Sequence, residues 1–151
     1  MMTAPDALRT PLKVLLVEDE EADANLVRLA FDEGHVLVEV HHVLDGVEAF
    51  AFLRREPPYP DAPTPDLILL DLNMPRMDGR QFLQKIKQTD PFMRIPVVVL
   101  TTSDAETDMV ASYCSGAAGF IVKPMDVNDF IDKVKGLGNY WITVVKLPDN
   151  D

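Results

Sequence analysis

The chain has 151 residues, of which 47% are hydrophobic and 26% are charged, and its formal net charge is −11. These values are typical of one soluble globular domain with a sizeable core. The negative charge argues against nucleic acid as a partner, because phosphate binding requires a basic surface. The sequence has no apolar run of membrane-spanning length and no apolar signal-peptide region, and its single cysteine, Cys114, excludes an intramolecular disulfide. We therefore expect one cytoplasmic domain that binds neither nucleic acid nor membrane.

Five apolar segments with strand character alternate along the chain with five segments of helical periodicity. The run Leu67–Leu70 is apolar throughout and lies between Pro65 and Pro75, which is typical of a strand buried on both faces of a parallel sheet. The alternation predicts a parallel sheet with helices on both faces and right-handed crossovers. The strand segments are 13–17, 36–43, 67–71, 96–100 and 119–122.

Each helical segment carries an apolar stripe that we expect to face the sheet. Asp45 with Glu48, and Ser103 with Glu106, have the spacing of a capping box at the start of the second and fourth helices. The five prolines between positions 54 and 65 predict an irregular loop before the third strand. The stripe residues are Ala22, Leu26, Leu29 and Ala30 in the first helix, Val47, Phe50 and Ala51 in the second, and Phe82, Leu83 and Ile86 in the third.

Polar side chains stand at the ends of four of the five strands. Glu18 and Asp19 follow the first strand, Asp71 ends the third, Thr101 follows the fourth and Lys123 follows the fifth. Because the carboxyl ends of parallel strands share one edge of the sheet, we expect these side chains to converge. Converging carboxylates raise one another's pKa unless a cation neutralises them, and oxygen ligands suit Mg²⁺. The sequence thus predicts an aspartate nucleophile, a divalent metal and two ligands for phosphate oxygens.

Each of these residues also has an ordinary structural explanation. An aspartate after a strand is often only a turn or cap residue, and a Glu-Asp pair before a helix often only complements the helix dipole. Their joint appearance at the matching ends of alternate elements favours a functional site.

Five short motifs carry a family resemblance. They are Val-Glu-Asp at 17–19, Leu-Leu-Asp-Leu-Asn-Met-Pro at 69–75, Met-Asp-Gly at 77–79, Leu-Thr-Thr-Ser at 100–103 and Gly-Phe-Ile-Val-Lys-Pro at 119–124. Together they resemble the receiver domains of two-component response regulators, of the chemotaxis-regulator type. The proline-rich loop and the C-terminal tail look similar to stand-alone regulators associated with phytochromes.

The resemblance implies a doubly wound, flavodoxin-like (βα)5 receiver fold with a C-terminal extension. It divides the chain into a lead-in at 1–11, a receiver domain at 12–137 and an extension at 138–151. The tail segment 140–147 has β-type composition. Two interpretations of it stay open, a strand packed on its own domain and an exposed arm that forms a homodimer.

The resemblance also assigns the metal site. Asp71 is the expected phosphoacceptor and a ligand of Mg²⁺. Asp19 would bind the ion directly, Glu18 would bind it through water, and Asn73 would contribute its backbone carbonyl. Glu18 departs from the aspartate that is more common in the family, which should alter the metal geometry without abolishing binding.

The remaining roles concern the phosphoryl group and the switch. Thr101 and Lys123 would bind its oxygens, and Phe120 stands at the position of the switch aromatic that turns inward when Thr101 moves. The Lys123-Pro124 peptide is expected to be cis. The side chains of Asn73 and Ser103 would flank the path of the hydrolytic water and so modulate dephosphorylation.

The function implied is that of a phosphoacceptor switch. A sensor histidine kinase, such as a bacteriophytochrome, or a phosphotransfer protein would phosphorylate Asp71, and the chain would then change its protein-interaction surface. It would assist its own phosphorylation and dephosphorylation without being an enzyme in the ordinary sense. No output domain follows in the sequence, so a protein partner or self-association would carry the signal.

Two other functions compete with this one. A phosphatase with an aspartate nucleophile generally has Asp-x-Asp, and here Asn73 stands at the second aspartate. A receiver-like interaction module without phosphorylation would not need the complete set of Glu18, Asp19, Asp71, Thr101 and Lys123. The three histidines, at 35, 41 and 42, are expected to lie away from the catalytic edge.

Overall fold

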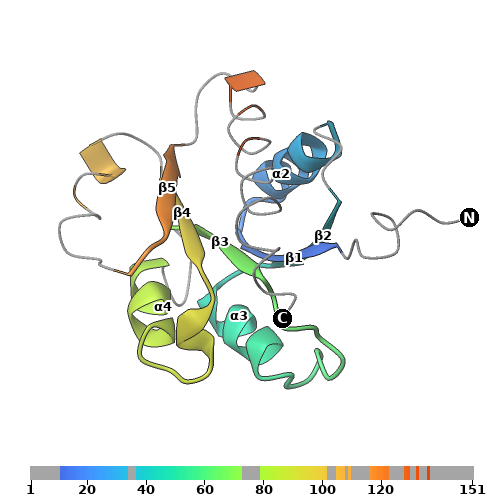
Figure 1. Ribbon diagram of the computed structural model, residues 1–151, viewed down its shortest axis with the longest axis vertical. Coiled ribbons are helices and arrows are strands. Elements are labelled where there is room, and N and C mark those ends of the chain that lie inside the picture. The colour runs from blue at the N-terminus through green and yellow to red at the C-terminus, as the bar shows by residue number, and fades with distance from the viewer. Residues whose placement is uncertain are drawn as a thin grey trace, which may run out of the picture.

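Five parallel strands form the centre of the molecule (Figure 1). The computed structural model describes residues 11–33, 37–72, 79–101, 105–107, 109, 116–122, 128–129, 132 and 136. Within them the strand order is β2-β1-β3-β4-β5, and each neighbouring pair is parallel, as predicted. The strands are β1 (Leu12–Val17), β2 (Val38–Val43), β3 (Leu67–Asp71), β4 (Val97–Thr101) and β5 (Gly119–Val122).

The central strand β3 is buried along its whole length, as its apolar run predicted. Ile68 and Leu70 pack into the core on one face of the sheet, and Leu67 and Leu69 into the core on the other. Burying one such side chain contributes about 1.5–3 kcal/mol relative to leaving it exposed. Packing on both faces of the sheet therefore fixes β3, the strand that ends at Asp71.

Helices cover both faces, which confirms the doubly wound fold (Figure 1). Helix α2 (Glu21–Glu33) lies on one face, and α3 (Gly46–Leu53) and α4 (Gly79–Ile86) lie on the other. The rings of Phe50 on α3 and Phe82 on α4 lie 5.0 Å apart between centroids and join these two helices. The apolar stripe predicted for the third helix is buried as expected.

The predicted inward face of the first helix is wrong for two residues. Leu29 is 45% exposed and Ala22 is exposed, whereas Ala24, Val27 and Phe31 are buried. The helix offers two stripes of similar spacing, and the one with the aromatic side chain of Phe31 faces the sheet. Leu29 is two residues from Phe31 and therefore points to nearly the opposite side.

The second helix is also turned from its predicted orientation. Val47 is exposed and Ala51 is only half-buried, while Phe52 and Leu53 are buried instead. The predicted cap is present, because Oδ1 of Asp45 accepts a hydrogen bond from the Glu48 N–H at 2.9 Å. Oε1 of Glu48 reaches back to the Leu44 N–H. These two bonds satisfy backbone donors around the first turn of α3.

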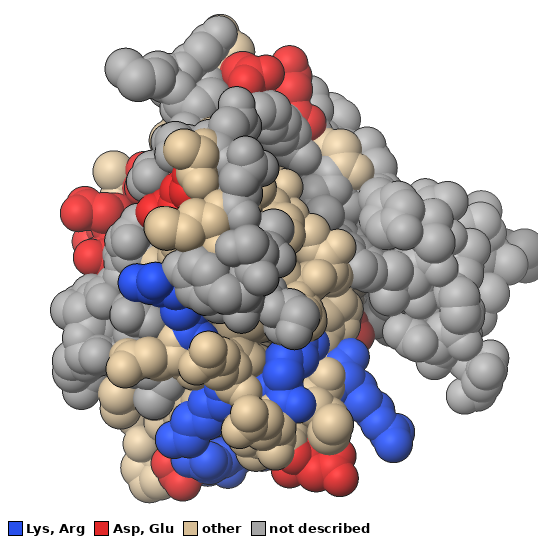
Figure 2. Space-filling model, turned by 90° about the vertical axis from the view of Figure 1, so that its left-hand side faces the viewer, with Lys and Arg blue, Asp and Glu red and all other residues tan. Residues whose placement is uncertain are grey.

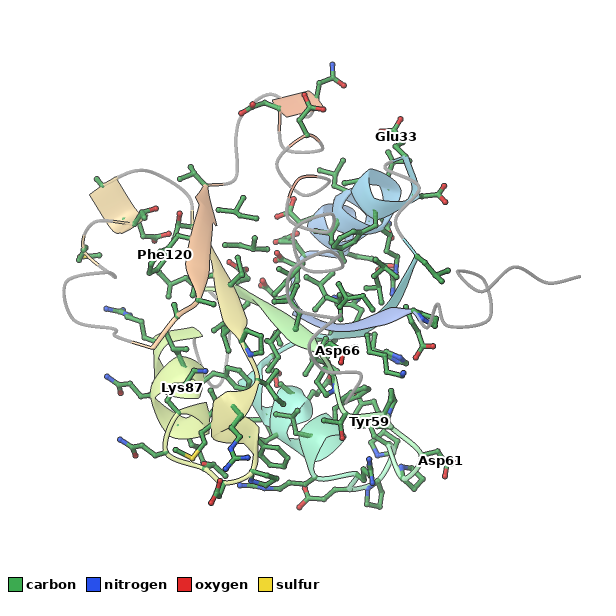
Figure 3. All side chains as sticks on the ribbon, in the orientation of Figure 1. Glu33, Tyr59, Asp61, Asp66, Lys87 and Phe120 are labelled. Carbon is green, nitrogen blue, oxygen red and sulfur yellow. The ribbon has the colours of Figure 1, made fainter. Side chains whose placement is uncertain are left out.

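The proline-rich loop is irregular, as predicted, and is fixed by packing against α3. The ring of Tyr59 lies 5.5 Å from that of Phe52, and Figure 3 shows Tyr59 and Asp61 at this end of the molecule. Burial and the neighbouring Glu48 carboxylate raise the pKa of Tyr59. Arg55 Nε donates to the Ala62 carbonyl at 2.8 Å and closes the loop.

The connection from α4 to β4 contains a short helix that the sequence did not reveal, η1 (Phe92–Arg94). Lys87 Nζ donates to the carbonyls of Met93 and Ile95 across this connection (Figure 3). Burial lowers the pKa of the Lys87 ammonium. The cap predicted at Ser103 and the tail segment 140–147 lie outside the described residues. Among the helices described, none has the length and apolarity that a membrane span requires.

Candidate functional site

Three carboxylates meet at the carboxyl edge of the sheet, as the sequence predicted. Oxygen atoms of Glu18, Asp19 and Asp71 all lie within 4.8 Å of one another. Glu18 is fully buried and Asp71 is 4% exposed, whereas Asp19 reaches solvent. No other group of three or more potential metal ligands occurs among the residues that the structure describes.

The register of two adjacent strands brings these residues together. Val17 on β1 pairs with Leu70 on β3, so the residues that follow the pair lie side by side at the edge. The Glu18 N–H donates to the Val43 carbonyl at 3.0 Å, and Oε2 of Glu18 accepts from the Glu20 N–H at 3.2 Å. The loop that follows β1 is thus hydrogen-bonded to β2, and the Glu18 carboxylate also accepts a hydrogen bond from the backbone of the same loop.

A cation would relieve the charge repulsion within this cluster. Buried carboxylates at this separation repel one another strongly in a medium of low dielectric constant. Mg²⁺ binds oxygen ligands and keeps several waters, so a cluster with two buried carboxylates and one that reaches solvent fits it. Among the described residues visible in Figure 2, Lys and Arg side chains gather over the lower part of the face. Arg54 ends α3 and Lys85 lies in the last turn of α4, at the opposite edge of the sheet.

Gly79 supports the backbone directly behind Asp71. Its N–H donates to the Leu72 carbonyl at 2.9 Å, and a Cβ at this position would lie 2.6 Å from the Asp71 carbonyl oxygen and from Leu72 Cα. Only a hydrogen atom fits there. Gly79 belongs to the Met-Asp-Gly motif at 77–79, and its close approach to the backbone explains why glycine is needed there.

Thr101 lies at the end of β4 and is fully buried. Val99 pairs with Phe120 on β5, so Phe120 and Thr101 share the face of the sheet that α3 and α4 cover. Phe120 is half-buried against that core (Figure 3). Oγ1 of Thr101 lies 2.7 Å from Oγ1 of Thr107, a contact that the sequence analysis did not foresee.

Several predicted site residues lie outside the described part of the chain. They are Asn73, Ser103, Lys123 and Pro124. The roles assigned to them, and the expected cis peptide between Lys123 and Pro124, stay predictions.

The expectation that no histidine lies near the catalytic edge is wrong for His42. Its Nε2 lies 2.6 Å from the backbone carbonyl oxygen of Glu18, and because a carbonyl can only accept, His42 donates this hydrogen bond. His41, the preceding residue, instead pairs with Glu39 through Nε2. A contact between a side chain and a backbone oxygen 24 positions away leaves no pattern in the sequence, which is why it was missed.

We expect His42→Ala to weaken Mg²⁺ binding, because Glu18 is a predicted ligand and His42 orients its backbone. Loss of a group that orients a metal ligand typically costs about 10–100-fold in affinity, and a backbone contact should lie near the lower value. Calorimetric titration with Mg²⁺ measures the change. His41→Ala is the matched control and should bind Mg²⁺ like the wild type; equal affinities for the wild type and His42→Ala would contradict the prediction.

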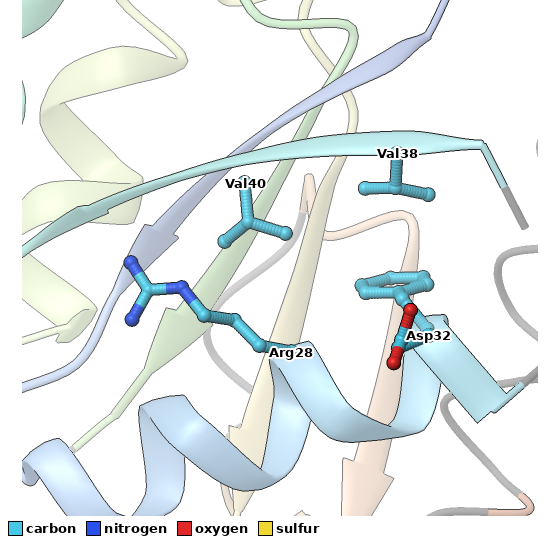
Figure 4. A pocket seen from close by; sticks show the side chains of 5 residues that line it. Arg28, Asp32, Val38 and Val40 are labelled. Atoms are coloured by element: carbon cyan, nitrogen blue, oxygen red, sulfur yellow. The ribbon is translucent and has the colours of Figure 1, made fainter.

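A hollow of about 240 Å³ lies between α2 and β2, away from the acidic cluster (Figure 4). It is lined by Phe31, Val38 and Val40, with Arg28 and Asp32 at its side. None of the three clustered carboxylates lines it. We therefore place the candidate site at the sheet edge.

Comparison with known proteins decides the family. The model of the response regulator receiver domain matches residues 14–135. The chain belongs to the response regulator receiver family. It is 41% identical over 143 residues to the response regulator Rcp1 of Synechocystis sp. PCC 6803, an alignment that covers 95% of this chain and 97% of Rcp1.

Solved structures of receiver proteins agree with this assignment. The phosphorylated cyanobacterial phytochrome response regulator RcpA is 43% identical, with a TM-score of 0.81 over 90% of this chain and 97% of that one. The bacteriophytochrome response regulator AtBRR is 38% identical, with a TM-score of 0.74 over 88% and 96% of the two chains. The protein is thus a response regulator, and receiver domains of this family accept phosphoryl groups from sensor kinases rather than act as ordinary enzymes.

Proposed function

We propose that Asp71 is the residue that accepts the phosphoryl group, in a site completed by Mg²⁺. The observation that carries this proposal is the cluster of Glu18, Asp19 and Asp71 at the end of the buried strand β3. A phosphoryl acceptor has to be held in line with its donor, and β3 is fixed by core packing on both faces.

The carboxylates of Glu18, Asp19 and Asp71, together with the backbone carbonyl of Asn73, are the groups that would hold Mg²⁺. The Mn²⁺-bound form of Rcp1, 41% identical to this chain, is a solved structure and supports a divalent metal site. When bound, Mg²⁺ neutralises negative charge on the equatorial oxygens of the phosphoryl group.

The chain's own residues then act by position and charge. An oxygen of the Asp71 carboxylate forms a bond to phosphorus while the bond from phosphorus to the imidazole nitrogen of the donor phosphohistidine breaks, and that nitrogen keeps the electron pair. Lys123 and Thr101 bind the oxygens of the transferred group. The product adds charge and strong acceptor oxygens at one strand end, and Thr101 with Phe120 passes this change to the surface near β5.

Return to the resting state needs a water in line with Asp71. The side chains of Asn73 and Ser103 flank this path in our proposal and modulate the lifetime of the phosphorylated chain, which in this way assists its own dephosphorylation. An aspartate-based phosphatase is not favoured, because the chain belongs to the receiver family and carries Asn73 where such enzymes have an aspartate.

The proposed donor is a sensor histidine kinase of the phytochrome class, or a phosphotransfer protein, in the cytoplasm. The names of the RcpA and AtBRR structures, which connect those two proteins with phytochromes, support this choice. Failure of an autophosphorylated bacteriophytochrome to transfer its phosphoryl group to this chain would exclude that class of donor.

Acetyl phosphate tests the site without the kinase. With Mg²⁺ present, intact-mass spectrometry should show a gain of one phosphoryl group per chain, and a chelator should prevent the gain. Repeated turnover of small phosphate esters would point to a phosphatase instead.

We further propose the domain division 1–11, 12–137 and 138–151, in which the last segment forms a dimerisation arm. The family match at 14–135 and the β-type composition of 140–147 support this division. We expect a chain that ends at Leu137 to elute as a monomer in size-exclusion chromatography at concentrations where the full chain is a dimer. A dimer of unchanged stability in the shortened chain would rule out the arm.

A further inference from the structure

The hydroxyl of Thr101 has a hydrogen-bond partner on the helical segment that follows β4. Its Oγ1 lies 2.7 Å from Oγ1 of Thr107, and Thr101 has no exposed surface. A buried hydroxyl without a partner is costly, so this contact stabilises the position that Thr101 takes here.

We propose that Thr107 is a positioning residue that holds Thr101 in the conformation of the unphosphorylated protein. This inference rests on the proposed function, in which Thr101 binds a phosphoryl oxygen on Asp71. A threonine hydroxyl has a single hydrogen, so it cannot donate to Thr107 and to a phosphoryl oxygen at the same time. Phosphorylation and Thr107 therefore compete for the same donor.

The donor in this pair is assigned from the behaviour of helical threonines. Such a side chain commonly donates its own hydrogen to the carbonyl four residues earlier. Thr89, in the bend just after α4, does so, with Oγ1 at 2.6 Å from the Lys85 carbonyl oxygen. We accordingly propose Thr101 as the donor and Thr107 as the acceptor, a direction that the contact allows.

The position of Thr101 is coupled to Phe120 through the sheet. Thr101 pairs with Val122 and Val99 pairs with Phe120, so Thr101 and Phe120 lie on the same face of neighbouring strands. Phe120 is only half-buried in this state. A residue that holds Thr101 in place therefore acts on the strand pair that carries Phe120, and Thr107 sets how readily the switch operates.

The expected effect follows from a shift of populations. Removing the hydroxyl of Thr107 weakens only the unphosphorylated arrangement, so the phosphorylated one becomes more populated. The net stabilisation by one hydrogen bond usually changes an equilibrium constant by about fivefold. We expect Thr107→Val, which keeps the branched shape of the side chain, to lower by about fivefold the acetyl phosphate concentration at which half the chains carry a phosphoryl group.

The experiment measures this half-point, the acetyl phosphate concentration at which half the chains are phosphorylated, by intact mass at fixed Mg²⁺. Thr107→Val is compared with the wild type and with three further variants. Thr107→Ser keeps a hydroxyl and should return to the wild-type value. Thr89→Val removes another threonine hydroxyl, in the bend after α4 at the opposite end of the sheet, and should leave the half-point unchanged. In a Thr101→Val background, Thr107→Val should have no effect, because the competing donor is gone. A thermal melt of each variant shows whether it is folded.

The outcomes separate the two proposals. A half-point for Thr107→Val equal to or above that of the wild type, or an effect that persists in the Thr101→Val background, would overturn the role of Thr107 while leaving Asp71 as the acceptor. A wild-type chain that gains no phosphoryl group would instead overturn the proposed function, and the role of Thr107 with it.

Discussion

Asp71→Asn should gain no phosphoryl group from acetyl phosphate and Mg²⁺ under conditions in which the wild type gains one per chain. The amide that replaces the carboxylate is not a nucleophile toward phosphorus, while its size and the burial of β3 leave the fold in place. Intact-mass spectrometry with and without a chelator measures the difference.

The same variant should also respond differently to Mg²⁺ in a thermal melt. Without the ion, Asp71→Asn should melt above the wild type, because one of three clustered negative charges has been removed. With the ion at a hundredfold excess over its Kd, the wild type should gain about 2.7 kcal/mol of stability, and the variant should lose most of this gain.

Asp45→Asn is the matched control for this experiment. Asp45 is also a buried carboxylate, at the exit of β2, two strands from β3, where it caps α3. Asparagine caps a helix about as well as aspartate, so this variant should fold and be phosphorylated like the wild type. Phosphorylation of Asp71→Asn at the wild-type rate would place the acceptor elsewhere. An equal loss in Asp45→Asn would show that the effect is a general disturbance of the edge.

Gly79→Ala is expected to have the largest effect on stability. The new Cβ would lie 2.6 Å from the Asp71 carbonyl oxygen and from Leu72 Cα, and both are backbone atoms that move only if the end of β3 moves. Overpacking of this kind costs about 1–3 kcal/mol or more. For a domain of this size each kcal/mol lowers the Tm by about 2–4 °C. Phosphorylation should fall as well, because the displaced backbone carries Asp71.

Gly136→Ala is the control, because this substitution is expected to raise the stability of the protein. Gly136 is helical and exposed, and a Cβ added there meets no atom within 4 Å. Alanine should therefore stabilise the protein by about 0.5–1 kcal/mol, because glycine is a poor helix former. Differential scanning calorimetry of both variants measures the contrast. A Gly79→Ala chain with the Tm and the phosphorylation of the wild type would show that the strand end adjusts without cost.

The sheet could be predicted from the sequence because its central strands are apolar on both faces. A parallel strand with helices on both faces buries Leu67–Leu70 completely, and the polar residues that follow parallel strands then meet at one edge. The orientation of α2 could not be predicted in the same way, because two apolar stripes compete and the packing of Phe31 decides between them. Contacts that join distant residues through a backbone oxygen or between two hydroxyls, such as those of His42 and Thr107, have no periodic signal at all.

Strand β2 is the outermost strand on its side of the sheet, and the loop with Glu18 is bonded to it through Val43 and His42. Outer elements open locally at a lower free energy than central ones. A ligand that fixes the Glu18 loop must therefore also suppress the fraying of β2, since the two share these hydrogen bonds. Amide hydrogen exchange along residues 38–43 would in this way report on metal occupancy at a carboxylate cluster that lies one strand away.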